Sequence, residues 1–219
     1  AAAIYGSRAT AGVIIVTTRR GRAGRTSVSY NGNYSIDQVA NKYEVLNAAQ
    51  YRQIAEDVGV GIDDGGADTD WLKEVTRTPV SHSHNLSLSG GNERTTYYAA
   101  LNYRNLQSID RGGRREFVNG TIRFNTKALN DKLDFSISLT NSYDNRGFAN
   151  YGALAQSLNM NPTYPVKNSD GTFFENPDIP FFLQWNPVAS MNNNMSRNKE
   201  KRFLGNVTLS YPILPNLRA

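Results

Sequence analysis

Four aspartates in one short stretch have the type and spacing that could bind a cation. The segment DDGGADTD places Asp63, Asp64, Asp68 and Asp70 close together among glycines, and carboxylates held in such a loop can bind calcium. The stretch does not follow the ligand pattern of an EF-hand. We therefore expect a solvated acidic loop, with calcium binding as the alternative, and no other cofactor.

Two histidines form an H-x-H pair, a spacing that is also compatible with a metal. His82 and His84 fall on one face of a strand, and they share that face with Leu86 and Leu88. No Asp or Glu lies on the same strand to complete a site. We expect a structural role at the border of an apolar face rather than a metal centre.

The chain shows no catalytic constellation. GSRAT lacks the G-x-S-x-G spacing of a nucleophile elbow, and His82 and His84 are the only two histidines. Cysteine is absent, which excludes disulfides and thiolate metal sites. The net charge of +5 is modest, and the basic residues are interspersed with acidic ones, so nucleic-acid binding is not expected. We predict a protein that is not an enzyme.

Six segments show the period-two alternation of strands with one apolar and one polar face. The polarity is mostly uncharged, because only 20% of the residues are charged while the mean hydropathy is -0.53. Asn, Ser and Thr occupy most polar positions. The segments are TSVSYNGNYSI (26–36), HSHNLSLSG (82–90), TTYYAALNYRN (95–105), FVNGTIRFNT (117–126), LDFSISLTNSY (133–143) and FLGNVTLSY (203–211).

The connections between these strands alternate in length, which is typical of transmembrane β-barrels with short periplasmic turns and long outer loops. Long connections follow the first and the fifth strand, at 37–80 and 145–199. Tyr97 and Tyr211 lie toward the short-turn end, and Tyr34, Tyr103 and Tyr143 toward the long-loop end, as two aromatic girdles would require. The alternative is an antiparallel sandwich with one face on a core, which gives the same alternation.

The long connections contain structure of their own. In LNAAQYRQIAEDVG, Asn47 and Gln50 can form a capping box, Leu46 can pack on Tyr51, and Gly59 can end the helix. A second short helix is expected at YGALAQSLN, and PVKNSDGTF predicts a hairpin turn at 168–171.

The apolar run from Val13 to Val16 is too short for a membrane-spanning helix, and its arginines follow it, which is the reverse of a signal peptide. We expect a buried strand there, followed by a solvated basic linker, in a chain that begins inside a larger protein.

The segment AAAIYGSRATAGVIIVTTRRGRAGRTSVSYNG resembles the end of the plug domain and the first barrel strand of SusC/RagA-like TonB-linked outer-membrane transporters. The segments LNAAQYRQ, DTDWLKEV, HSHNLSLSGGNERTTYYAALNY and WNPVASM resemble that family's first extracellular loop, second and third strands, and third loop, in the same order. The resemblance covers essentially the whole chain.

The resemblance implies an all-β fold that is part of a barrel of about 22 strands closed by an N-terminal plug. Residues 1–22 would be the end of the plug and 23–219 the first part of the barrel, with helix-containing extracellular loops. Such proteins import oligosaccharides, peptides or similar nutrients across the outer membrane. They are energised by TonB through a segment missing from this chain, and they work with a SusD-like surface lipoprotein.

Residues that could meet a nutrient or partner are aromatic in the loops and polar on the inward face. The alternatives to an importer are a soluble β-sandwich that binds carbohydrate and a passive porin. We expect Arg104 and Arg123 to pair with carboxylates of the plug or wall. The loop candidates are Trp71, Phe148, Tyr151, Tyr164, Phe173 and Trp185, and the lumen-facing candidates are Asn102, Arg104, Asn119, Arg123 and Asn125.

Overall fold

The computed structural model describes residues 23–180, 183–194, 196–214 and 217–218. The strand expected at Val13 to Val16, the linker after it and the boundary at residue 22 lie outside the described residues.

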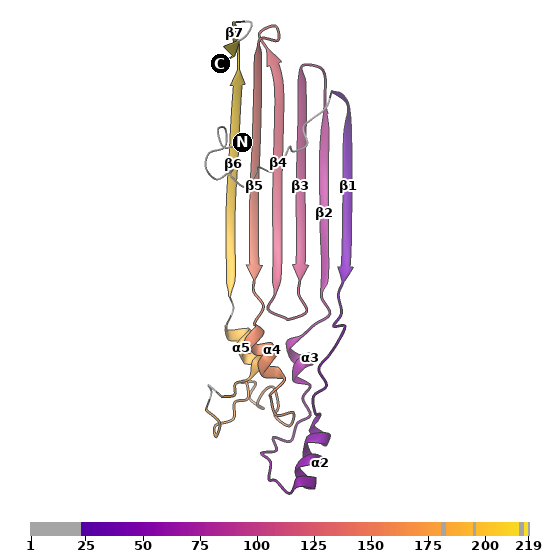
Figure 1. The fold of residues 1–219 in the computed structure, drawn as a ribbon, viewed down its shortest axis with the longest axis vertical. Helices are drawn as coiled ribbons and strands as arrows, with labels where there is room; N and C mark the ends of the chain where they lie inside the picture. The colour runs from indigo at the N-terminus through magenta and orange to yellow at the C-terminus, as the bar shows by residue number, and fades with distance from the viewer. Residues whose placement is uncertain (1–22, 181–182, 195, 215–216, 219) are drawn as a thin grey trace, which may run out of the picture.

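Six long strands form a single antiparallel sheet in which every strand pairs with its neighbour in the sequence (Figure 1). This is the order that a meander of hairpins gives. A two-stranded ribbon of β7 (Pro212–Leu214) and β8 (Leu217–Arg218) follows the last long strand. The long strands are β1 (Gly24–Ile36), β2 (Val80–Gly91), β3 (Thr95–Gln107), β4 (Arg114–Ala128), β5 (Leu133–Gly147) and β6 (Arg197–Ser210).

The strands are longer than the alternating segments from which we predicted them. Strand β2 begins two residues before His82, and β5 continues four residues past Tyr143, because backbone pairing extends beyond the apolar positions. Strand β6 ends at Ser210, so Tyr211 lies just outside the strand on which it was expected.

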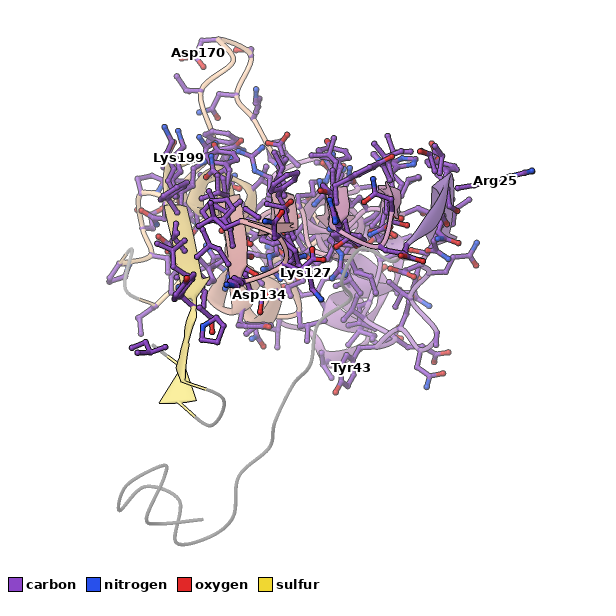
Figure 2. The ribbon with its side chains drawn as sticks, turned by 90° about the horizontal axis from the view of Figure 1, so that it is seen from above. Arg25, Tyr43, Lys127, Asp134, Asp170 and Lys199 are labelled. Carbon is purple, nitrogen blue, oxygen red and sulfur yellow. The ribbon has the colours of Figure 1, made fainter. Side chains whose placement is uncertain are left out.

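The register brings side chains of one kind into rows across the sheet. One row runs through Val28, Leu88, Ala99, Ile122, Leu139 and Gly205, and we call the face that carries it the apolar face. The opposite, polar face carries rows such as Lys127 with Asp134. Figure 2 looks along the strands and shows Lys199 projecting on one side of the sheet and Lys127 and Asp134 on the other.

No second sheet covers either face within the described part of the chain. Large side chains of the apolar face therefore stay open, with exposed fractions of 66% at Val28, 57% at Ile122 and 58% at Val207. The sandwich alternative needs a second sheet packed on such a face. None of the described helices is long and apolar enough to cross a membrane.

The strand connections alternate in length as the sequence predicts. Strands β2 and β3 join through 92–94, where the Asn92 side chain accepts hydrogen bonds from the backbone of Arg94 and Thr95. Strands β4 and β5 join through 129–132, where three consecutive residues, Leu129 to Asp131, have positive φ. The long connections, 37–79 and 148–196, and the loop 108–113 leave from the other end of the sheet.

Among the described residues, the long connections contain four helices: α2 (Ala48–Val58), α3 (Trp71–Val75), α4 (Tyr151–Ser157) and α5 (Pro187–Asn193). Helix α2 has the predicted capping box of Asn47 and Gln50, and Gly59 ends it with φ 67°. Helix α4 and the hairpin turn at 168–171 are also confirmed, the latter by a hydrogen bond from Gly171 N to Asn168 O. The packing of Leu46 on Tyr51 stays a prediction.

Candidate functional site

The two long connections fold together into one body with its own core, which we call the loop unit (37–79 and 148–194). Trp71, Met160 and Tyr164 form this core, with exposed fractions of 3%, 8% and 2%. Three partly buried side chains, Val166, Phe174 and Val188, pack around it. Residues almost a hundred positions apart are therefore joined beyond the end of the sheet.

A seam of hydrogen bonds runs between segments 63–71 and 161–164. The Trp71 indole Nε1 donates to Asn161 O over 2.9 Å, and Thr69 Oγ1 donates to Tyr164 O over 2.6 Å. The backbone of Ala67 donates to Thr163 O over 2.8 Å. Because the seam includes backbone groups along both segments, it fixes their register as strand pairing would.

Asp63 accepts hydrogen bonds from two residues of the second connection. The Tyr164 hydroxyl donates to its Oδ2 over 2.8 Å, and Asn176 Nδ2 donates to the same oxygen over 2.6 Å. Burial, and then the hydrogen bond to the Asp63 carboxylate, raise the pKa of Tyr164. Tyr164 is thus a neutral donor that holds the two connections together.

The aspartate side chains of the acidic stretch do not come together as a cation site. Asp64 forms an ion pair with Arg52 (2.7 Å), and hydrogen bonds from Arg52 and from the Gly66 backbone lower the pKa of Asp64 to about 2. Asp68 accepts from Ala48 N, and Asp70 caps helix α3 by accepting from Lys73 N. Within the described residues, no group of three or more His, Asp or Glu side chains could hold a metal ion. The aspartates serve as local acceptors.

A groove of about 780 Å³ lies between the two connections. Glu44, Gln50 and Tyr51 line it from the first connection, and Asn159 and Gln184 line it from the second. Its lining mixes amides, carboxylates and rings, which suits a polar ligand better than a hydrocarbon.

The polar face carries an uninterrupted row of asparagines. Asn31, Asn85, Asn102 and Asn119 stand opposite one another on four successive strands, and Asn85 donates to the amide oxygen of Asn102. The structure brings all the lumen-facing candidates to this face: Asn102, Arg104, Asn119, Arg123 and Asn125.

A compact ion cluster lies nearer the loop end of the same face. Asp144 is 6% exposed and binds Arg115 over 2.7 Å and Arg146 over 2.5 Å. Arg115 also lies over the ring of Phe117, 5.1 Å from its centroid. Arg104, on β3 opposite Phe117, forms no ion pair within the described part of the chain, and Arg123 lies over the ring of Tyr98.

The histidine pair belongs to an aromatic cluster on the apolar face. His82 Nδ1 and His84 Nε2 are 3.1 Å apart, and the Tyr30 hydroxyl lies 2.7 Å from His84 Nδ1. Tyr34 stacks on His82, and Tyr103 contacts both imidazoles. Both histidines lie toward the loop end of the sheet, so their geometry accords with a structural role there.

The aromatic candidates fall into buried and accessible groups. Trp71 and Tyr164 are core residues of the loop unit, so they act through its shape. Phe148 and Tyr151 are 50% and 77% exposed and open to a partner. Phe173 lies under the Lys167 ammonium, and Trp185 lines a depression beside helix α5.

Sequence reasoning missed helices α3 and α5 and the side chains that start them. Asn186 is fully buried, caps α5 through Val188 N and Ala189 N, and donates to Val166 O and Phe174 O. Its signal was present, because Asn followed by Pro is a helix start. Asp110 is also buried, and its carboxylate accepts hydrogen bonds from Gly112 N, Gly113 N and Ser108 Oγ.

The described part of the chain is a six-stranded antiparallel sheet with one polar and one apolar face, and its long connections gather at one end. The chain is 32% identical to the TonB-dependent receptor SusC of Bacteroides thetaiotaomicron over 100% of its own length and 24% of SusC. It is 29% identical to TonB-dependent receptor P26 of Formosa agariphila, over 95% of this chain and 22% of that protein. No family model matches the chain.

Solved structures share the fold. A structure of the RagAB peptide transporter superposes with a TM-score of 0.69 and 18% identity, over 98% of this chain and 29% of that one. The closed-closed state of the RagAB peptide importer gives a TM-score of 0.67 at the same identity and coverage.

The chain belongs to the SusC/RagA family of TonB-dependent receptors, of whose members it spans about a quarter. Receptors of this family reside in the bacterial outer membrane and are not enzymes, in agreement with the predicted location and the predicted lack of catalysis.

Proposed function

We propose that this chain is the first part of the wall of an active outer-membrane importer. The observation that supports this most is the single sheet with one apolar and one polar face, whose long connections fold together at one end. On this proposal residues 23–219 belong to the barrel and residues 1–22 to the end of the plug. TonB would be contacted by another part of the complete receptor.

The apolar face would meet lipid. From Leu133 to Tyr143 on β5, apolar-face positions cover ~34 Å at ~3.4 Å per residue, which becomes ~26 Å for a strand tilted by ~40°. That length agrees with the ~25 Å apolar band of outer-membrane barrels. Tyr97 near the short turns, and Tyr34, Tyr103 and Tyr143 near the loops, would form its aromatic girdles.

The polar face would line the lumen, where neutral amides offer donors and acceptors to an incoming polar chain. The asparagine row suits sugar hydroxyls and peptide groups equally, so we propose oligosaccharides or peptides as nutrients. The likeness to the RagAB peptide transporter favours peptides. Contacts would come from Asn102, Arg104, Asn119, Arg123 and Asn125.

The loop unit would carry the contact with a SusD-like surface lipoprotein. Its core and its seam make it a preformed surface rather than a tether, and Phe148 and Tyr151 are exposed on it. Aromatic side chains of this kind are favoured in protein interfaces. The groove between the connections would then be shared between the receptor and its lid.

Adjacent residues on opposite faces give the sharpest test of orientation. The chain contains no cysteine, so Leu101→Cys and Asn102→Cys can be compared in a cysteine-free complete receptor. In intact outer-membrane vesicles a membrane-impermeant maleimide should label position 102 and leave position 101 unlabelled until the protein is denatured. Equal labelling of both positions would contradict the assignment of the two faces and with it the proposal.

Uptake separates an importer from a passive porin. Cells that produce the complete receptor should accumulate a labelled glycan or peptide, and a protonophore should abolish that uptake. Phe148→Ala with Tyr151→Ala should reduce recovery of a co-purifying lipoprotein, while Tyr43→Ala, in the first connection and as exposed as Tyr151, serves as the control. Uptake that persists without an energy gradient would indicate a porin.

A further inference from the structure

Four arginines line a cavity where the loop unit meets the strand ends. The cavity has a volume of about 220 Å³ and is bounded by Arg77, Arg111, Arg114 and Arg197. Glu74 is the one acidic residue among the described residues that line it. The lining therefore carries an excess of positive charge.

Two of these guanidinium groups, those of Arg77 and Arg111, donate to backbone carbonyl oxygens. Arg77 donates through Nε to Ser108 O (3.0 Å) and through Nη2 to Gly113 O (2.7 Å), and Arg111 Nε donates to Thr76 O (3.1 Å). Among the described residues, Arg77, Arg111 and Arg114 form no ion pair, in contrast to the arginines bound to Asp144 on the polar face. Carbonyl oxygens fix the position of Arg77 and Arg111 without cancelling their charge.

The cations are also close enough to repel one another. Burial lowers the pKa of Arg77, and although Asp110 opposes this, Arg111 and Arg114 lower it further. The Asp110 carboxylate is already held by Gly112 N, Gly113 N and Ser108 Oγ. Like charges around one cavity favour an anion inside it.

The size and charge of the cavity favour a doubly charged, tetrahedral anion. Guanidinium forks match the oxygens of phosphate, and several of them together bind a dianion better than a single carboxylate. A volume of about 220 Å³ admits one such group with a few waters but not a nutrient chain. A phosphate monoester therefore fits the cavity better than a peptide carboxylate does.

The surroundings point to a lipid as the source of the phosphate. Arg114 and Arg197 stand in one row with Gly147, and Lys199 and Lys201 follow Arg197 on the same side of β6, which is the apolar face. On the proposed function, on which this step rests, that border lies at the headgroup level of the outer leaflet. We propose that the cavity binds the phosphate monoester of a lipid headgroup, with Lys199 and Lys201 guiding the lipid along the wall.

The test compares Arg111→Gln/Arg114→Gln with Arg94→Gln in the complete receptor, purified in detergent. Arg94 is a matched exposed arginine at the short-turn end. The ligands are detergent micelles that contain a monophosphorylated lipid, micelles with its dephosphorylated form, and inorganic phosphate. The native receptor and the Arg94 variant should bind the phosphorylated lipid alone, and the double variant should bind it at least ~10-fold more weakly.

Each other outcome overturns part of the proposal. Equal binding by the double variant and the native receptor would exclude the cavity. Inorganic phosphate that binds the native receptor in an arginine-dependent way, without preference for the phosphorylated lipid, would replace the lipid by a soluble phosphate. Heat-modifiable migration of both variants on gels tests the barrel separately. If the proposed function is wrong, this migration is absent, whether or not phosphate binds.

Discussion

In the six-stranded sheet large apolar side chains remain open, whereas in the loop unit they are packed against one another. Leu101 and Val207 on the apolar face are 50% and 58% exposed, while Trp71 and Tyr164 in the loop unit are 3% and 2% exposed. Both regions come from one chain, and both contain strong apolar patterns. The two regions differ in the surroundings that their apolar side chains require.

The difference shows that the loop unit carries its own hydrophobic stabilisation and the sheet does not. Burying a large apolar side chain contributes about 1.5 to 3 kcal/mol, which the loop unit gains internally. On the proposed function, the apolar face gains it from lipid, and the edge strands β1 and β6 gain further partners from other strands of a barrel. Mutations should therefore affect the two regions independently.

The largest effect is expected from Trp71→Ala in the complete receptor. Removing the central side chain of the loop unit should destabilise that unit by about 3 to 5 kcal/mol, because it leaves a cavity beside Met160 and Tyr164. Limited proteolysis should then cut within 37–79 and 148–194, while heat-modifiable migration of the barrel is retained. Tyr151→Ala, at an exposed position, is the control, and loss of the heat-modifiable band in Trp71→Ala would show that the regions are coupled.

The wall should respond to charge on one face only. Ile137→Arg, on the apolar face, should cost about 2 to 4 kcal/mol near the membrane midplane, whereas Ser138→Arg, its neighbour on the polar face, should cost little. Unfolding of the complete receptor from lipid vesicles by guanidinium measures both. Similar costs at the two positions would contradict the assignment of the faces.

A smaller, local effect is expected at the start of helix α2. Asn47→Ala removes the side chain that accepts from Gln50 N (2.9 Å), and it should weaken the helix by about 1 kcal/mol. Hydrogen exchange of residues 48–58 should accelerate while the sheet is unaffected. Asn47→Asp keeps an acceptor and should preserve protection, and a change spread through the sheet would argue against independent regions.

The smallest effect is a loss of order in the loop unit under acid. The pKa of Asp64 is about 2, below its usual value, because Arg52 stabilises the carboxylate. The stabilisation is complete above the unfolded pKa near 4, and it is lost as the pH falls through about 2. Carboxyl NMR of the complete receptor should show this titration, and Arg52→Gln should return the Asp64 pKa toward its ordinary value. An unchanged pKa in that variant would remove Arg52 as the cause.

The strands of the sheet could be predicted from the sequence, because the alternation of apolar and polar residues is a local pattern. Val28, Tyr30, Tyr34 and Ile36 share one face of β1 whatever the rest of the chain does, and the turns at 92–94 and 129–132 follow from short polar segments. The same alternation restricts the register to shifts of an even number of residues, because a slip by one residue would move every apolar side chain to the polar face.

Only parts of the loop unit could be predicted from the sequence. The capping box at Asn47 is local and was predicted, but the role of Trp71 depends on Asn161 and Met160, almost a hundred residues away. Only the structure therefore shows which candidate contact residues are buried and which are exposed. The cavity lined by arginines could not be predicted for the same reason, since Arg77 and Arg111 come from two separate connections and Arg197 from the start of β6.

The hydrogen bond between Tyr164 and Asp63 joins residues 101 positions apart, and four strands of the sheet lie between them in the chain. Closing so long a loop is entropically costly until the intervening hairpins have formed and brought the two connections together. The seam must then be among the last contacts to form during folding. The surface that the loop unit presents to other proteins is therefore complete only after the hairpins of this part of the sheet have formed.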